Sequence, residues 1–195
     1  LVVIHKPEGV LSVATLFEKD LTAHSILKKR YYKQRVYPVH RLDRETSGVM
    51  VFAYSDKAKE GLKEQFKKHT ISRKYFAVVE GQMKEKSGVW KSFLKEDSSY
   101  YVRSHATGAP AITHFKVVKV TGSYSYISLR LETGKKNQVR VHAQDAGHPI
   151  VGDDLYGSRA GEGNIPSRLC LHATSIAFLH PTTRSPVEFE VGCPF

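Results

Sequence analysis

One carboxylate stands between two arginines in residues 40–53, whose sequence is HRLDRETSGVMVFA. Arg41 and Asp43 are two positions apart, so on extended backbone their side chains leave the chain on the same side. Guanidinium groups nearby favour the ionised form of a carboxylate, which could act as a nucleophile or a base, or stabilise positive charge. An aspartate ahead of the polar residues 45–48 is also a natural turn former. The pattern alone leaves both interpretations of Asp43 open.

A second group of polar residues lies in residues 131–157, LETGKKNQVRVHAQDAGHPIVGDDLYG. Lys135, Lys136 and Asn137 stand where a predicted hairpin ends and a predicted helix begins. Their donors and the helix N-terminus could therefore converge on an anion. Arg140 lies one turn inside that helix, where the pattern alone favours a solvated charge opposite the apolar stripe.

The elements that must position these residues are mainly strands. The run at residues 49–54 is apolar on both alternating faces, which predicts a central strand buried on both sides. A hairpin is predicted around the TGS turn, with Ile127, Leu129 and Leu131 on one face. Further strands are expected at residues 2–4, at 72–80 with a stop at Gly81, near Trp90 and Tyr100, and at 171–181 and 185–192.

Three helices are predicted between these strands. The first spans residues 21–33 with Asp20 or Thr22 as its cap. The second is capped by Asp56 and carries Ala58, Leu62 and Phe66 on one face; the third has the stripe Val139, Ala143 and Ala146 and ends at Gly147. The turn-rich stretch at residues 147–157 is expected to line a surface or a cleft.

Strands outnumber helices and do not alternate regularly with them, which indicates an α+β fold with a mixed, largely antiparallel central sheet and flanking helices. A chain of 195 residues fits one compact domain, or two tightly joined halves. The start, LVVIHKPEGV, has no initiator methionine. We expect a single domain over residues 1–195 of a chain trimmed at its N-terminus.

The charge balance indicates a polyanionic partner. Lys and Arg number 30 against 19 Asp and Glu, which gives a net charge of +11. Phosphate neutralisation by such side chains drives nucleic-acid binding, although a soluble basic protein would fit the composition equally well. Neither Cys170 nor Cys193 belongs to a CxxC pair, which fits a reducing cytoplasm. No apolar stretch reaches membrane-spanning length.

The chain resembles the RluA family of pseudouridine synthases. The signature of that family is HRLDR, any residue, TSG and an apolar run that ends in FA, and residues 40–53 match every fixed position. Four more motifs follow the family in the same order: KPEGV, KYFAVVEG, TGKKNQVRVHAQDAGHPIVGDDLYG and LCLHATSIAFLHP. The resemblance covers essentially the whole chain and implies the pseudouridine synthase fold with a central active-site cleft.

Site residues follow from this resemblance, position by position. Asp43 would be the essential carboxylate and Arg140 its salt-bridge partner. Tyr75 would be the aromatic residue that lies against the target base, and Leu171 an apolar wall of the same pocket. The strand pattern by itself instead favours Tyr75 as an ordinary aromatic residue that faces the core.

One departure from the family concerns RNA contacts. The family usually has Arg, Thr and His where this chain has Lys135, Lys136 and Asn137. Both sets donate hydrogen bonds, so we expect activity to survive and contacts with a particular RNA to differ. We expect Arg41 and Arg44 to contact the phosphates, or the gap beside a flipped nucleotide.

The implied activity is the isomerisation of specific uridines in structured RNA to pseudouridine, with base flipping. This reaction needs no metal and no cofactor. We expect ribosomal RNA as the substrate, with tRNA second, and a cytoplasmic monomer without a membrane or an obligate protein partner. Three chemical routes are open to Asp43: attack at C1′, addition to the base, or removal of a ribose proton.

Two alternatives remain. The first is a basic RNA-binding module without catalysis. The second is a metal-independent ribonuclease that uses His40 and His142 as acid and base. The sequence has no HExxH motif and no paired Cys/His spacing, so we interpret His40, His142 and His148 as hydrogen-bonding or RNA-facing groups rather than metal ligands.

Overall fold

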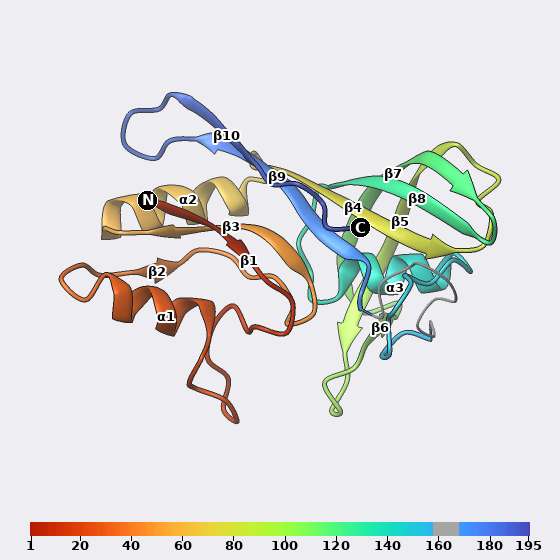
Figure 1. The fold of residues 1–195 in the computed structure, drawn as a ribbon, viewed down its shortest axis with the longest axis horizontal. Helices are drawn as coiled ribbons and strands as arrows, with labels where there is room; N and C mark the ends of the chain where they lie inside the picture. The colour runs from red at the N-terminus through yellow and green to blue at the C-terminus, as the bar shows by residue number, and fades with distance from the viewer. Residues whose placement is uncertain (158–167) are drawn as a thin grey trace. The chain divides into compact units, whose positions relative to one another are not determined.

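The computed structural model describes residues 1–157 and 168–195 (Figure 1). These residues form ten strands and three helices. The chain divides into two compact units, of which unit 1 comprises Leu1–Arg73 and Ala173–Cys193. Unit 2 comprises Lys74–His172 and Pro194–Phe195. The single catalytic domain expected over residues 1–195 stays a prediction.

Unit 1 is built around a fully buried strand. Its strands are β1 (Val2–Lys6), β2 (Tyr37–Pro38), β3 (Ser47–Ala53), most of β9 (Leu171–Leu179) and β10 (Pro186–Glu190). β3 lies between β1 and β9, while β2 also pairs with β3 and β10 with β9. All seven residues of β3 are buried. The central strand predicted from the unbroken apolar run is therefore confirmed.

Two helices belong to unit 1. Helix α1 (Ala23–Arg30) is capped by Thr22. It begins later than predicted because Leu21 has a positive φ of 51°, and it also ends earlier, at Arg30 instead of Lys33. Helix α2 (Asp56–Lys67) is capped by Ser55, whose hydroxyl accepts a bond from the Ala58 amide at 3.2 Å. The prediction of Asp56 as the cap was wrong.

Unit 2 contains an antiparallel sheet. Its strands in spatial order are β4 (Ser72–Glu80), β8 (Tyr124–Leu131), β7 (Ala109–Thr121), β5 (Ser87–Glu96) and β6 (Val102–Ser104), with β4 beginning at the end of unit 1. The predicted hairpin is confirmed as β7 and β8. The strands expected near Trp90 and Tyr100 are confirmed as β5 and β6, and Tyr100 itself lies just before β6 with a φ of 63°.

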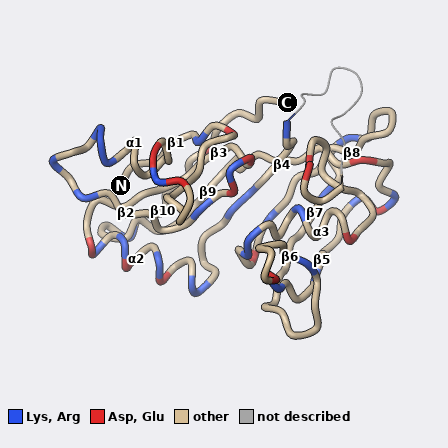
Figure 2. The backbone as a smooth tube through the Cα atoms, turned by 90° about the horizontal axis from the view of Figure 1, so that it is seen from below, with Lys and Arg blue, Asp and Glu red and all other residues tan. Residues whose placement is uncertain are grey.

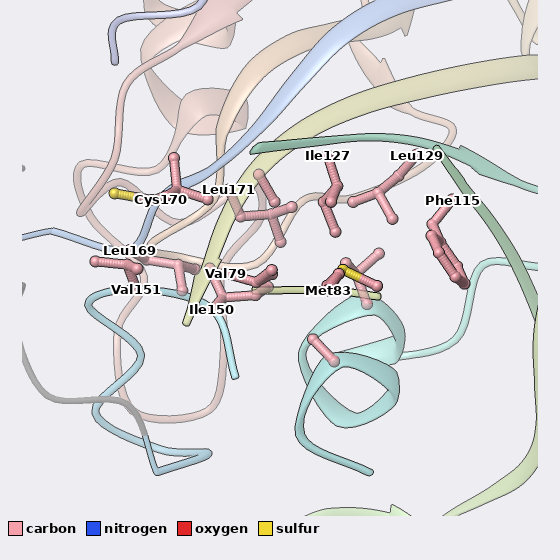
Figure 3. Close-up of a cluster of buried hydrophobic side chains, with 14 of the residues drawn as sticks. Val79, Met83, Phe115, Ile127, Leu129, Ile150, Val151, Leu169, Cys170 and Leu171 are labelled. Atoms are coloured by element: carbon pink, nitrogen blue, oxygen red, sulfur yellow. The ribbon is translucent and has the colours of Figure 1, made fainter. Parts of the chain in front are cut away.

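Helix α3 (Gln138–Asp145) covers the apolar core of unit 2 (Figure 3). Ile127, Leu129 and Leu131 contribute to this core from β8, as predicted. Val139 and Ala143 contribute from α3, whereas Ala146 is exposed and does not continue the predicted stripe.

The stretch at residues 147–157 is turn-rich as predicted but is not confined to the surface. Ile150 and Val151 are completely buried in the core of unit 2. Gly152 has a φ of +75°, and a Cβ there would lie 1.9 Å from the Arg168 carbonyl oxygen. Only glycine permits this close backbone approach.

The α+β class is confirmed, and the strand pairs within each unit whose register is defined are antiparallel. Among the described residues, no helix is both long and apolar enough to cross a membrane.

Candidate active site

Asp43 lies in the loop between β2 and β3, and this loop is fixed mainly through its backbone. The buried Ser12 hydroxyl accepts a bond from the Leu42 amide at 2.9 Å and donates to the Leu42 carbonyl at 2.6 Å. The Thr46 amide donates to the Asp43 carbonyl at 3.2 Å and closes a turn. The Asp43 side chain is half-buried. Asp43 therefore forms a turn through its backbone, and this turn is compatible with a functional role for its carboxylate.

Lys6 fixes the other side of this loop. It is fully buried, and its Nζ donates to the carbonyl oxygens of Pro7 at 2.8 Å and Val10 at 2.7 Å. The same Nζ donates to the Arg44 carbonyl at 2.9 Å. One ammonium group therefore joins the KPEGV turn to the residue after Asp43. Sequence reasoning did not single out Lys6, although it lies inside a motif that matched the family.

Gly48, inside the motif, occupies a position that only glycine permits. Its φ is +126°, and a Cβ there would lie 2.2 Å from the Ala173 carbonyl oxygen. The backbones of β3 and β9 could not approach this closely with any side chain at this position. The close approach holds the C-terminal end of the Asp43 loop in place.

The two arginines of the motif have exposed side chains. Arg44 forms an ion pair with Glu18, with both side chains about two-fifths exposed. An ion pair of this exposure contributes little to stability, so RNA phosphate could replace Glu18 at low cost. RNA contacts of Arg41 and Arg44 stay a prediction.

His40 supports the strand that follows the loop. Its Nε2 accepts a bond from the Val51 amide at 3.0 Å, and its ring stacks on Phe66 with centroids 5.0 Å apart. Burial lowers the pKa of His40 to about 3, and the charge of Arg73 lowers it further. His40 is therefore neutral near pH 7 and acts as a structural acceptor.

Arg140 is held by a buried carboxylate in unit 2. Its Nε donates to Asp153 Oδ2 at 2.8 Å and its Nη2 to Asp153 Oδ1 at 2.6 Å. Asp153 is 1% exposed and Arg140 is 8% exposed. Asp153 Oδ1 also accepts the amides of Leu155 and Tyr156, each at 3.0 Å. The interpretation of Arg140 as a solvated charge was wrong, because a bidentate partner compensates its burial.

The predicted ion pair of Asp43 with Arg140 would join unit 1 to unit 2, and it stays a prediction. Arg140 bonds to Asp153 and Asn137. A guanidinium group carries five N–H donors and can bind more than one acceptor.

The three residues before α3 have different environments. Asn137 is buried with a left-handed φ of 55°, and its Nδ2 donates to the Tyr156 hydroxyl at 3.1 Å. Lys136 forms an ion pair with Glu96 and donates to the Tyr100 carbonyl at 3.0 Å. Lys135 is exposed. Direct RNA contacts stay a prediction for all three, and burial makes Asn137 a residue that positions its neighbours.

Tyr75 and Leu171 border the same apolar cluster. Tyr75 lies on β4 opposite Leu129, is half-buried and packs against the core of unit 2. Leu171 is 3% exposed and belongs to that core (Figure 3). Tyr75 is thus a partly buried aromatic at the border of the core, and its role as the base-contacting aromatic stays a prediction.

His142 lies on α3, two residues after Arg140, and is 2% exposed. Its Nδ1 lies 3.0 Å from Thr113 Oγ1 and its Nε2 lies 2.9 Å from Ser92 Oγ. Burial lowers the pKa of His142 to about 4, and the charge of Asp145 opposes this shift. Together with the low pKa of His40, these contacts argue against a ribonuclease that uses the two histidines near neutral pH.

In the part of the chain that the structure describes, no group of three or more His, Cys, Asp or Glu side chains is arranged to bind a metal ion. His148 Nδ1 lies 2.7 Å from the Glu80 carbonyl oxygen, which makes it a structural group.

Comparisons with known proteins identify relatives of this chain. Residues 1–145 match the family described as RNA pseudouridylate synthase. Ribosomal large subunit pseudouridine synthase C of Vibrio vulnificus (strain CMCP6) is 34% identical over 97% of this chain and 62% of that protein. tRNA pseudouridine synthase C of Haemophilus ducreyi (strain 35000HP / ATCC 700724) is 33% identical over 97% of this chain and 86% of that protein.

Among solved structures, Human RNA Pseudouridylate Synthase Domain Containing 1 matches 99% of this chain and 80% of its own, with a TM-score of 0.80 and 27% identity. The chain spans between 52 and 66% of the length of four curated relatives that it matches. The family match covers most of the chain and includes the Asp43 loop, Tyr75 and α3. The chain therefore belongs to the RNA pseudouridylate synthase family.

Proposed function

We propose that the protein isomerises specific uridines in structured RNA to pseudouridine, with Asp43 as its essential carboxylate. The observation that carries this proposal is the Asp43 loop, in which the family motif is fixed by Lys6 and Ser12. A fixed loop presents the Asp43 carboxylate with little reorganisation, which is what catalysis at a developing charge requires.

The reaction breaks the bond between N1 of the base and C1′ of the ribose, turns the base, and forms a bond from C5 to C1′. Breaking a glycosidic bond builds positive charge at C1′, which a carboxylate can stabilise or trap covalently. Asp43 would serve either role. The chemistry calls for no redox step, metal or cofactor.

The uracil must stay in the site while it turns. Tyr75 would contact one face of the ring, because an aromatic face holds a base without fixing its rotation. Leu171 would contribute to the apolar wall beside it. The target uridine must first leave the RNA stack, at a cost of a few kcal/mol. Contacts of Arg41 and Arg44 with phosphate would offset that cost.

Arg140 would form an ion pair with Asp43 and so hold it ionised. Asp153 would then keep Arg140 in place from the other side, because its two oxygens bind the guanidinium edge that Arg140 presents to it. Asp153 is a positioning residue that the sequence did not reveal.

Ribosomal RNA is our first expectation for the substrate, and tRNA the second. The net charge of +11 supports a polyanionic substrate. Relatives at similar identity bear the names of ribosomal and tRNA enzymes. A cytoplasmic location and a monomeric state stay predictions.

Release of tritium from [5-³H]uridine tests the proposal, because isomerisation exchanges the hydrogen at C5 when that carbon forms the new bond. Wild-type protein and Asp43→Ala would each be incubated with unmodified ribosomal RNA and, separately, with a tRNA pool. We expect release by the wild type alone, on RNA that stays intact.

Strand scission in place of tritium release would indicate a ribonuclease. Tight RNA binding without release from either pool, unchanged in Asp43→Ala, would favour an RNA-binding module without catalysis and would contradict the proposal.

A further inference from the structure

We propose that residues 28–35, KKRYYKQR, bind the phosphate backbone of single-stranded RNA, and that Tyr32 stacks on one of its bases. We call these residues the basic segment. The proposal rests on the proposed function only in taking RNA as the partner. The segment lies in unit 1, in the last turn of α1 and the turns that follow it.

The charge of this region is uniform. Residues 21–42 contain no Asp or Glu, and their six cations are Lys28, Lys29, Arg30, Lys33, Arg35 and Arg41. All six side chains are exposed. Figure 2 shows separate blue segments on the tan tube at and beyond the end of α1. A run of exposed cations without carboxylates is the surface that a chain of phosphates neutralises.

A helix C-terminus favours cations by itself, because the helix dipole is negative there. That effect explains Lys28, Lys29 and Arg30, which lie in the last turn of α1. It does not extend to Lys33 and Arg35, because both lie beyond the helix and the effect fades within one turn. The helix dipole therefore accounts for only part of the segment.

Helix α2 is an ordinary solvated surface, and cations on it form ion pairs with carboxylates of the same helix. Lys59 lies 3.0 Å from Asp56, and Lys68 lies 3.0 Å from Glu64. These carboxylates are three or four positions away on the same helix face. The corresponding positions of the basic segment offer none. Arg35 reaches Asp56 at 3.8 Å, with the two side chains 81% and 62% exposed, so this pair is weak.

The two tyrosines of the segment have different surroundings. Tyr31 turns inward, with its ring 5.4 Å from that of Tyr54 in an edge-on arrangement. Tyr32 is 77% exposed, and Lys33 Nζ lies 5.6 Å from the centre of its ring. An exposed aromatic ring among cations is the usual platform for an unpaired base, because stacking and phosphate contacts then act together.

Binding of a fluorescein-labelled, 12-nucleotide single-stranded RNA, followed by fluorescence anisotropy from low to moderate salt, tests the proposal. The triple variant K28Q/K29Q/K33Q should lower the slope of log Kd against log salt by about two, since each lost phosphate contact removes about 0.7. The control triple K57Q/K63Q/K67Q removes the same charge from exposed positions of α2 and should leave the slope unchanged.

Stacking has its own test with the same RNA. Tyr32→Ala should weaken binding about tenfold, whereas Tyr32→Phe should bind like the wild type, because it keeps the ring. No binding of the RNA by the wild type, or equal slopes for the two triple variants, would overturn the proposal. Stronger binding to vesicles that contain anionic lipid than to the RNA would assign the segment to a membrane surface instead.

Tritium release separates this proposal from the proposed function. If the wild type modifies RNA, K28Q/K29Q/K33Q should raise KM about tenfold and leave kcat unchanged, because the segment would bind RNA without touching the reacting base. A fall in kcat at saturating RNA would contradict a pure binding role. If the wild type modifies no RNA, the proposed function fails, and the salt slopes still decide the role of the segment.

Discussion

Asp43 and Arg140 are the two halves of the predicted catalytic ion pair, and the protein holds them in different ways. The Asp43 loop is fixed through the backbone of its neighbours, by Ser12 and Lys6. Arg140 is fixed through its own charge, by the two oxygens of buried Asp153. Loss of the Asp43 carboxylate thus leaves the anchors of the loop in place. Loss of the charge of Arg140 or of Asp153 instead leaves the partner's charge buried without compensation.

This difference teaches how stability and activity divide between the two units. A loop that depends on backbone anchors can present a reactive group that contributes little to folding. A buried ion pair makes the positioning of Arg140 part of the fold, since removal of one partner typically costs 3 to 5 kcal/mol. Variants of Asp43 should therefore mainly lower activity, whereas variants of the Arg140–Asp153 pair should mainly lower the free energy of unfolding.

The largest effect is expected for Asp43→Asn. Tritium release should fall by at least about 1,000-fold, because the variant removes the charge that the reaction needs. The free energy of unfolding in urea should fall by less than the roughly 3 to 5 kcal/mol typical of a buried ion pair that loses one partner. The reason is that Asp153 still pairs with Arg140 and the loop keeps its backbone anchors. Glu45→Gln, at an exposed position two residues later, is the matched control and should keep both properties. A large loss of stability in Asp43→Asn would remove the contrast between the two halves.

Asp153→Asn should lower the free energy of unfolding by about 3 to 5 kcal/mol, because it leaves Arg140 buried without its charge partner. It should also lower the rate of tritium release. Asp154→Asn changes the neighbouring carboxylate, which is exposed, and should leave the protein within about 0.5 kcal/mol of the wild type. Urea unfolding of both variants makes the comparison. Equal stability would mean that Asp153 does not compensate the charge of Arg140.

Gly48→Ala tests the backbone anchoring of the Asp43 loop. We expect a loss of about 3 kcal/mol, because strain at positive φ adds to the clash with Ala173. Gly122→Ala separates these causes, because Gly122 has a φ of +57° with no atom within 4 Å of an added Cβ. It should cost about 1 kcal/mol. Equal losses in thermal or urea unfolding would show that the close approach to Ala173 contributes nothing.

The smallest effect is a pH dependence of stability on the Arg140 side. The pKa of His142 is about 4 in the folded protein, against an ordinary value of 6.5. Between pH 4 and pH 6.5 the imidazole of His142 binds a proton in the unfolded chain but not in the folded protein. The contribution of neutral His142 to the free energy of unfolding is therefore fully present above pH 6.5 and falls as the pH drops toward 4. The loss should reach about 1 to 2 kcal/mol near pH 5.

His142→Gln should flatten this dependence, because glutamine cannot titrate. His40→Gln should reduce the same loss by a similar amount, because the folded pKa of His40 is about 3 and its titration has the same sign. Urea unfolding at pH 7 and pH 5 gives the measurement. If wild type and His142→Gln lost equal stability between these pH values, His142 would not titrate as its burial implies.

Local patterns predicted most elements of the fold. The unbroken apolar run predicted a strand buried on both faces, and β3 is such a strand. Alternation predicted the β7 and β8 hairpin. The cap of α2 was wrong by one residue, because both Ser55 and Asp56 are good cap residues and only backbone geometry distinguishes them.

Burial of polar residues could not be predicted in the same way. The stretch at residues 147–157 is rich in turn residues, yet Asp153 and Tyr156 are buried in unit 2. Arg140 likewise has the pattern of a surface residue on an amphipathic helix. Each of these side chains is buried because a partner elsewhere in the chain compensates it.

The sequence by itself determined the elements, the family and the candidate carboxylate, because periodicity and motif spacing depend on residues close together along the chain. Tertiary structure decided which partner each polar group has. Lys6 binds the carbonyl of Arg44, which is 38 positions away, and Arg140 binds a carboxylate 13 positions away. Such pairings depend on distances through space, which the order of residues does not give.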